Sequence, residues 1–284
     1  MRLPHPSPSP PRTGRRPQLA YFGGIDFSGA REPLSNLWAA VGREREGKLE
    51  IVSLCPLPFR EDLRAHVAGA WRRHVDAGDD DAILWGADFP FGIPAAAAGR
   101  IAGERAATWA SIAAWIADRP PEEVWKGFPD LQKALRRTDT GGALSPFDMR
   151  LYKQTLEGIR FLHELRDTAD ISILPQVENA SARTLLVEVY PSGAAKELGI
   201  RGGRVPSRPG EVRARPAALK PFMSFAHPSM EACACTLEDA RDACIACLAA
   251  FLCREDLDQP YRLGRVPPEL LALEGWIYRP PAAL

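Results

Sequence analysis

The sequence lacks any apolar run long enough to cross a membrane. Its longest apolar stretches are interrupted by charged residues, well before the roughly 18 residues that a spanning helix needs. It also lacks a net charge, because 36 lysines and arginines balance 36 aspartates and glutamates. We therefore expect a soluble protein without membrane contact, in which any binding of nucleic acid depends on a local basic patch.

Cysteine is absent from the early part of the chain, where none precedes Cys55. Disulfides therefore cannot join the whole chain, which favours a reduced, cytoplasmic setting. Cys233, Cys235, Cys244 and Cys247 have a spacing that could suit zinc. The last two lie in an alanine-rich segment, where cysteine usually acts as a small hydrophobic residue. The sequence leaves metal binding by these four cysteines open.

Two further signatures of function are missing. No phosphate loop of the form GxxxxGK[ST] is present, which excludes the P-loop class of nucleotide site. His66, His74, His163 and His227 show neither metal-ligand nor catalytic-triad spacing. The sequence therefore points away from chemistry that depends on imidazole.

Enough apolar material is present for a sizeable core, since 45% of the residues are hydrophobic and 25% are charged. Residues 1–18 are rich in proline, serine and arginine and poor in apolar side chains, so we predict a disordered tail there. Residues 19–284 are predicted to form one domain with an embedded insertion.

Hydrophobic patterning predicts alternating strands and helices. Short apolar or alternating runs predict five strands, the first three forming an antiparallel meander around Glu46 and Gly47. Helical spacing dominates residues 95–182, which we interpret as an insertion, and a helix that Thr236 caps is predicted late in the chain. The predicted strands are 19–27, 36–41, 48–54, 82–87 and 185–190, and the late helix is 236–253.

Acidic residues occupy unusual positions on three of these strands. Asp26 ends the run AYFGGID, Asp88 follows AILWGA, and Glu188 lies inside LLVEVY. An ionised carboxylate in a buried strand costs several kcal/mol unless it is paired or bound to a metal. Three carboxylates on neighbouring strands would converge as hard oxygen ligands for a divalent cation.

The late helix adds two more acids, Asp239 and Asp242. Their spacing of three residues places both on one helix face, and small residues around them allow close approach to the sheet. Each acid also has a simpler interpretation. Asp26 could be a turn former, Asp239 a capping residue, and Glu188 the partner of a buried arginine such as Arg183 or Arg150.

The chain contains, in this order, the segments GIDFSGA, WGADFPFGIP, RLYKQTLEGI, LLVEVYPSGAAKELG, EDARDACIACLAAFL and EGWIY. This ordered set resembles the family known as domain of unknown function 429, whose members are regarded as predicted RNase H-like nucleases. The resemblance spans about residues 19–279. It implies an α/β fold of the RNase H-like class: a mixed five-stranded sheet flanked by helices, with a helical insertion between the fourth and fifth strands.

The resemblance also implies roles for the acids. The first strand of the wider fold carries a metal-binding aspartate and the fourth an acid, which Asp26 and Asp88 match. Holliday-junction-resolvase-like members carry two acids three residues apart on a late helix, as Asp239 and Asp242 are. Glu188 matches the family's own motif of Glu, any residue, an aromatic or His, then Pro.

We therefore expect Asp26, Asp88, Glu188 and Asp242 to bind Mg²⁺ or Mn²⁺, and these four with Asp239 to be catalytic. Two ions about 3.5 to 4 Å apart would activate water and stabilise the leaving oxygen in phosphodiester hydrolysis, with Asp26 bridging them.

Basic residues could hold the phosphates of a nucleic acid, DNA or RNA. Residues 196–220 carry seven of them among glycines and prolines, although such a run is often only a solvated loop. Two more lie in RLYKQT, where a helix-surface role is equally consistent. The predicted substrate contacts are Arg150, Lys153, Lys196, Arg201 and Arg204.

Two other function classes fit the same fold. Actin-like and sugar-kinase phosphotransferases also end their first strand in an aspartate, but here Asp26 is not followed by a clear phosphate hairpin with a lysine. A non-catalytic RNase H-like binding module is the other alternative, because a fold does not by itself confer activity. The sequence leaves the oligomeric state open.

Overall fold

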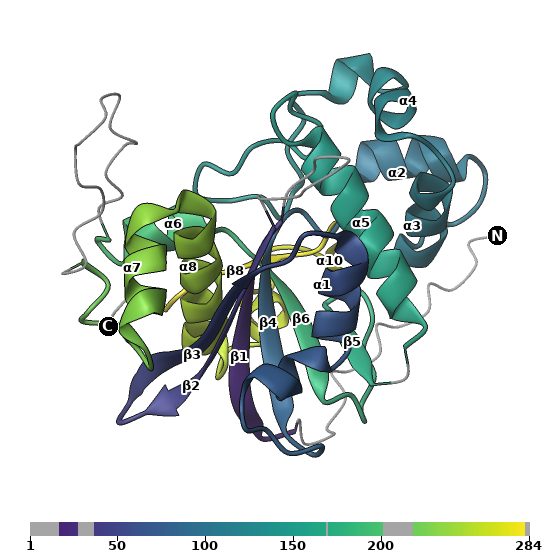
Figure 1. Cartoon of the computed structure of the whole chain (residues 1–284). Coiled ribbons are helices and arrows are strands. Elements are labelled where there is room, and N and C mark those ends of the chain that lie inside the picture. The colour runs from purple at the N-terminus through teal and green to yellow at the C-terminus, as the bar shows by residue number, and fades with distance from the viewer. Residues whose placement is uncertain (1–16, 28–36, 169, 201–217, 282–284) are drawn as a thin grey trace, which may run out of the picture.

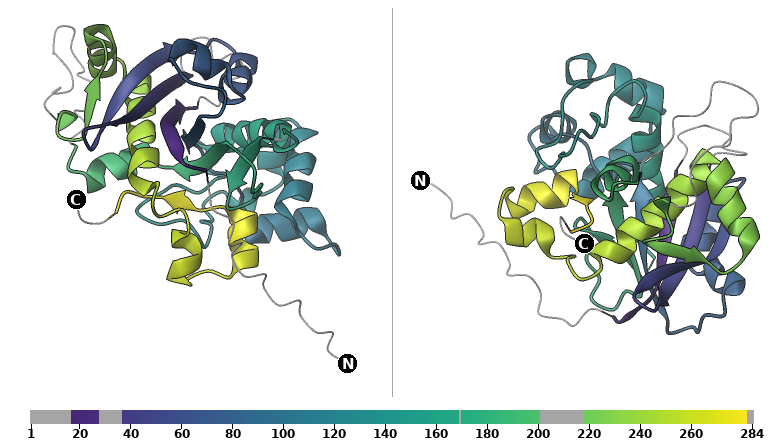
Figure 2. Two further views of the ribbon diagram at one scale, coloured as in Figure 1. Left: turned by 90° about the horizontal axis from the view of Figure 1, so that it is seen from below. Right: turned by 90° about the vertical axis from the view of Figure 1, so that its left-hand side faces the viewer.

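The computed structural model describes residues 17–27, 37–168, 170–200 and 218–281. Most of the predicted disordered tail, residues 1–16, lies outside these residues, as do Arg201 and Arg204. Among the described residues the chain forms a mixed α/β fold with helices on both faces of one sheet, as Figures 1 and 2 show.

In the described part of the chain the sheet has eight strands rather than the predicted five, in the order β5-β6-β4-β1-β2-β3-β7, with β8 also paired to β6. The first three form the expected antiparallel meander, and β4, β6 and β5 follow in parallel with β1. The strands are β1 Leu19–Asp26, β2 Trp38–Arg45, β3 Lys48–Pro56, β4 Ala82–Asp88, β5 Ile171–Leu174, β6 Thr184–Val189, β7 Met223–Phe225 and β8 Ile277–Tyr278.

Local sequence explains the central strands. Glu46 and Gly47 both adopt positive φ, 52° and 76°, which is the conformation of a tight hairpin turn between twisted strands. Strand β4 is buried along all but its last residue and β6 along its whole length, as expected for parallel strands covered on both faces.

The insertion is mainly helical, as predicted, but it also contains the short strand β5. Its helices are α2 Ala95–Ala102, α3 Trp109–Ala117, α4 Pro121–Lys126 and α5 Tyr152–Arg166, with a 3₁₀ turn at Pro129–Leu131. The helix α1 Arg60–Val67 and a 3₁₀ turn at Ala70–His74 precede β4. Side chains of α1, α3 and α5 form the apolar core on one face of the sheet.

The remaining helices follow β6. They are α6 Pro191–Glu197, α7 Pro228–Thr236, α8 Glu238–Cys253, α9 Gln259–Leu263 and α10 Pro268–Glu274. The late helix therefore begins two residues after the predicted cap, because the Thr236 hydroxyl bonds the Ala232 carbonyl oxygen within α7, at 2.9 Å. Within the described residues, no helix combines the length and apolarity needed to cross a membrane.

Helix α8 covers the other face and lies unusually close to the strands. A Cβ atom added at Gly24 would lie 2.0 Å from the Ala243 carbonyl oxygen, and one at Gly86 would lie 2.6 Å from the Ala246 carbonyl oxygen. These two glycines are direct neighbours across β1 and β4. Only glycine fits at such contacts, so the pair fixes the position of α8 against the centre of the sheet.

Candidate metal-binding carboxylate site

Asp26 and Asp88 are neighbours at one edge of the sheet. They are register partners in the parallel pairing of β1 with β4, so their Cα atoms lie on adjacent strands about 4.8 Å apart. Each residue is the last of its strand and is partly buried. The prediction that these two acids lie on adjacent strands is confirmed.

Both aspartates face α8. Side chains alternate between the faces of a strand, and Gly24 and Gly86, two residues before each aspartate, contact α8. Asp26 and Asp88 therefore lie on the α8 side. Asp242, on the second turn of α8, comes close enough for its charge to act on both of them.

Burial and neighbouring carboxylates disfavour the ionisation of all three carboxyl groups. Burial first, and then the charges of Asp88 and Asp242, raise the pKa of Asp26 to about 9. Burial and the Asp242 charge raise the pKa of Asp88 to about 8. Burial raises the pKa of Asp242 to about 6, although the nearby Arg241 opposes the rise. Uncompensated acids of this kind are frequent at functional sites.

Asp239 lies further out, on the first turn of α8. Its pKa is raised by burial and then by Glu238, and its charge contributes to the raised pKa of Asp26. Asp239 thus belongs to the same acidic face of α8 as Asp242, at the rim of the cluster that Asp26, Asp88 and Asp242 form.

Two side chains that the sequence did not single out support the cluster. The Gln154 amide donates a hydrogen bond to the Asp88 carbonyl oxygen, which brings the first turn of α5 beside the strand end. The Arg241 Nε lies 3.5 Å from an Asp242 carboxylate oxygen. Gln154 stands in the segment RLYKQT, yet nothing in its spacing indicates a contact 66 residues away.

Glu188 points to the opposite face of the sheet. It pairs in register with Ala87 rather than with Asp88, and Ala87 belongs to the apolar core beneath the insertion. The expectation that Glu188 joins Asp26 and Asp88 is corrected by this register, because a shift of one residue changes the face of a side chain. Its charge still contributes to the raised pKa of Asp88.

The partner of Glu188 is Arg136. Both terminal nitrogens of the guanidinium donate to the Glu188 carboxylate, one of them at 2.7 Å, and the Phe91 backbone N–H donates at 2.9 Å. Arg136 also binds Asp139, at 2.7 Å, and the Glu274 carbonyl oxygen, at 2.8 Å. The structure thus favours the alternative interpretation of Glu188, in which it is the partner of a buried arginine in a structural ion pair.

The arginines suggested as its partners bind elsewhere. Arg183 pairs with Asp80 at 2.8 Å and also contacts Asp170, and Arg150 pairs with Asp148 at 3.1 Å. No spacing rule in the sequence identifies Arg136, which lies 52 residues from Glu188 along the chain.

A family model described as "Protein of unknown function (DUF429)" matches residues 24–262. The chain belongs to the DUF429 family. The matched range includes the whole carboxylate cluster, Arg136 and Gln154. No curated protein and no solved structure was found to match this DUF429 chain.

The predicted substrate contacts of the DUF429 chain fall into three groups. Arg150 and Lys153 flank the start of α5, the helix whose Gln154 bonds the Asp88 carbonyl oxygen, and both are well exposed. Lys153 pairs with Glu122 at 2.9 Å. Lys196 is exposed near the end of α6. Arg201 and Arg204 lie outside the described residues.

The described part of the chain holds no group of three His, Cys, Asp or Glu side chains placed to bind a metal ion by themselves. The predicted four-ligand site is therefore not formed by these side chains alone. Mg²⁺ usually takes one or two carboxylates and completes its shell with water and substrate phosphate. Asp26 and Asp88, with Asp242 opposite, supply hard oxygen donors of that kind, so these residues fit such an ion.

The four cysteines for which the sequence left zinc binding open also form no such metal-binding group within the described residues. Cys244 and Cys247 are buried inside α8, and all four cysteines are free of disulfides. Burial raises the pKa of Cys244 and Cys247. A thiol that resists ionisation is a poor metal ligand, so these two side chains act as small apolar residues that allow α8 to approach the sheet.

Proposed function

We propose that this protein is a metal-dependent nuclease that hydrolyses phosphodiester bonds with Mg²⁺ or Mn²⁺. The observation that carries the proposal is the Asp26 and Asp88 pair at the ends of two parallel strands, with Asp242 of α8 beside it. A cluster of acids whose pKa values are raised by burial and by neighbouring carboxylates is suited to a positively charged ligand.

The strand order supports an RNase H-like fold. Three antiparallel strands are followed by a fourth strand parallel to the first, and the acids lie on the first and fourth strands. A helix that carries a pair of acids three residues apart covers the same face. This combination is what the family resemblance implies for an RNase H-like nuclease.

Each residue has a role in this proposal. A bound divalent ion would activate water and neutralise charge on the scissile phosphate. Asp26 and Asp88, which would ionise on binding the cation, hold carboxyl oxygens at the C-terminal ends of two strands of a rigid sheet, and Asp242 adds a third carboxyl group from the helix. Gln154 fixes the strand end by its bond to the Asp88 carbonyl oxygen. Lys153 is exposed beside Gln154 and can contact a substrate phosphate.

The experiment is a cleavage screen over single-stranded, duplex, hybrid and branched DNA and RNA. Purified protein is tested with Mg²⁺, with Mn²⁺ and with a chelator. We expect cleavage of at least one substrate that requires the metal and is lost in Asp26→Asn, which removes a charge with little change in shape.

Asp130→Asn is the matched control, because Asp130 is an exposed partner of Arg100 in the insertion, at 2.6 Å. It should cleave like the wild type. If no substrate is cut, or if Asp26→Asn cuts as well as Asp130→Asn, the nuclease proposal fails and a non-catalytic module is favoured.

A further inference from the structure

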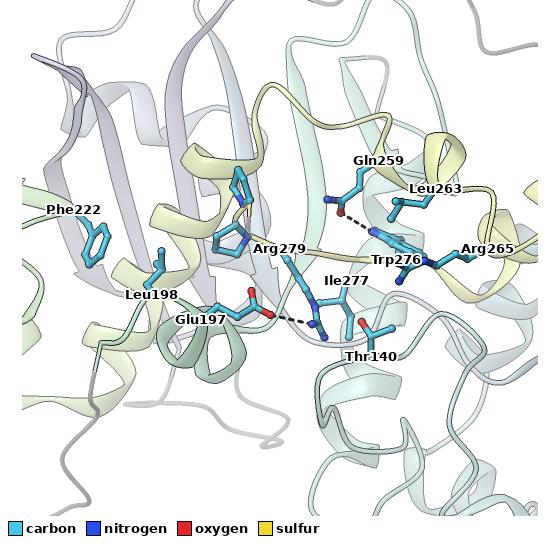
Figure 3. A pocket seen from close by; sticks show the side chains of 12 residues that line it. Thr140, Glu197, Leu198, Phe222, Gln259, Leu263, Arg265, Trp276, Ile277 and Arg279 are labelled. Atoms are coloured by element: carbon cyan, nitrogen blue, oxygen red, sulfur yellow. Dashed lines mark hydrogen bonds and ion pairs between the residues drawn. The ribbon is translucent and has the colours of Figure 1, made fainter. Parts of the chain in front are cut away.

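A second concave site lies away from the carboxylate cluster. It is a pocket of about 530 Å³ between the end of α6, the α9 region, β8 and the insertion. None of Asp26, Asp88 and Asp242 lines it. Figure 3 shows the side chains on which its chemistry depends: Thr140, Glu197, Gln259, Arg265, Trp276 and Arg279. The volume is in the range of small-ligand pockets, about 300 to 1,000 Å³.

The floor of this pocket is apolar and rigid. Trp276 and Ile277 line it and are only 6% and 4% exposed. The Trp276 ring nitrogen donates to the Gln259 side-chain oxygen at 3.4 Å, and the Gln259 amide donates to Asp256 at 3.1 Å. These contacts hold the indole in place beneath the pocket. The accessible apolar surface of the lining includes Leu263, which is 41% exposed, and Pro281.

One guanidinium is fixed at the side of the pocket. Arg279 donates to a Glu197 carboxylate oxygen at 2.9 Å, as the dashed line in Figure 3 marks. A Cβ atom at Gly141 would lie 2.0 Å from an Arg279 terminal nitrogen. The guanidinium therefore packs directly against the Gly141 backbone, and Glu197 neutralises its charge.

A second guanidinium in the pocket, that of Arg265, is available to bind a ligand. Arg265 lines the pocket on the side of Trp276 and is exposed. Within the described part of the chain it has no carboxylate partner, in contrast to Arg279 and to Arg262 of α9, which binds Asp256. The pocket thus combines an apolar floor, one unpaired positive charge and the Thr140 hydroxyl at its rim.

We propose that this pocket binds a nucleoside monophosphate, with the base on the apolar floor and the phosphate at Arg265. A guanidinium matches a phosphate with two parallel hydrogen bonds, and a base supplies a flat, largely apolar group that can cover the exposed Leu263 side chain beside Trp276. Thr140 supplies a hydrogen bond to a polar edge of the ligand. This site is separate from the proposed nuclease centre and does not depend on it.

Isothermal titration tests the proposal with the full chain in a chelator, which removes divalent metal from the carboxylate cluster. The four common nucleoside monophosphates are compared with their nucleosides and with inorganic phosphate. We expect at least one monophosphate to bind more tightly than its nucleoside and than phosphate. Absence of binding, or equal binding of phosphate alone, would overturn the proposal.

Two matched variants locate the ligand. Arg265→Met should weaken binding by about tenfold or more, because it removes hydrogen bonds from a charged donor. Arg100→Met is the control, since Arg100 is an exposed arginine of α2 that neither lines the pocket nor contacts a residue that does. It should bind the ligand like the wild type.

Asp26→Asn should also bind like the wild type, because the nuclease centre is not involved. Equal affinity of Arg265→Met and Arg100→Met, or loss of binding in Asp26→Asn, would contradict the assignment of this pocket. All three changes are at positions with no part in an apolar core, so thermal melts should confirm that each variant is folded.

Discussion

Two groups of acids lie at the same edge of the sheet but on opposite faces. On the α8 face, Asp26 and Asp88 stand side by side with Asp242, and their pKa values are raised by burial and by neighbouring carboxylates. On the insertion face, Glu188 accepts hydrogen bonds from Arg136 and from the Phe91 backbone.

The difference between these faces is the compensation of charge. Arg136 directs its guanidinium at Glu188, at Asp139 and at a backbone carbonyl. Burying that pair is tolerated because every donor has an acceptor. Among the described residues, the basic group beside the acids of the α8 face is Arg241, which is 3.5 Å from Asp242. The buried acid that has an arginine partner therefore forms a compensated ion pair, whereas the aspartates without a buried arginine keep raised pKa values, on which our proposal of a bound cation rests.

The largest effect is expected from breaking the compensated group. Arg136→Met leaves Glu188 buried without its counter-charge and should lower the free energy of unfolding by about 3 to 5 kcal/mol. Urea denaturation measures this loss. The double change Arg136→Met with Glu188→Gln should recover part of it.

Arg100→Met is the exposed counterpart, because both Arg100 and Asp130 are about half exposed. It should cost no more than about 1 kcal/mol. Equal losses in Arg136→Met and Arg100→Met would remove the distinction between a buried structural pair and a surface pair.

The next effect concerns the uncompensated group. Mg²⁺ or Mn²⁺ at about 100 times its Kd should stabilise the folded protein by roughly 2.7 kcal/mol, seen as a rise in Tm. Asp26→Asn should lose most of this rise. Glu188→Gln should keep it, although its own starting Tm is lower, because Glu188 faces the other side. A metal response lost in Glu188→Gln and kept in Asp26→Asn would reverse our assignment of the two faces.

The close packing of α8 against the sheet can be tested at Gly24, which contacts the helix backbone. Gly24→Ala forces a Cβ against the Ala243 carbonyl oxygen and should cost about 1 to 3 kcal/mol through overpacking. It should also weaken the metal response, because α8 carries Asp242. Gly99→Ala is the control: it lies in helix α2 with no atom near its added Cβ, and alanine there should stabilise by roughly 0.5 to 1 kcal/mol. A neutral Gly24→Ala would show that α8 adjusts freely.

The smallest effect, taken per pH unit, is the pH dependence of the free energy of unfolding that the Asp26 carboxyl group causes in metal-free protein. The pKa of Asp26 is raised from 3.8 to about 9 in the folded state, so its contribution to stability is full below pH 3.8 and is lost as pH rises toward 9. Asp26→Asn lacks this dependence. The stability of the variant relative to wild type should therefore increase over this window, by at most about 1.4 kcal/mol per pH unit. Denaturation curves that stay parallel from about pH 5 to 8.5 would contradict the raised pKa.

Local patterns were informative where a feature depends on neighbours within a few residues. Hydrophobic runs that end in an acid identified β1 and β4 and their aspartates, and the spacing of Asp239 and Asp242 placed both on one helix face. Strand β5 was missed. It has only four residues, all buried, which is too short a run to distinguish from the helical segments around it.

The sequence by itself determined the antiparallel meander, the helical character of the insertion and the positions of the acids on their strands. Each follows from a local period of two or 3.6 residues. Only the tertiary structure decided which acids meet. The register of β6 against β4 turned Glu188 away from Asp88, and Arg136 reached Glu188 from 52 residues away. The contact of Gly24 and Gly86 with α8 brought Asp242 to the aspartates, because close packing between distant segments depends on shapes that no local pattern records.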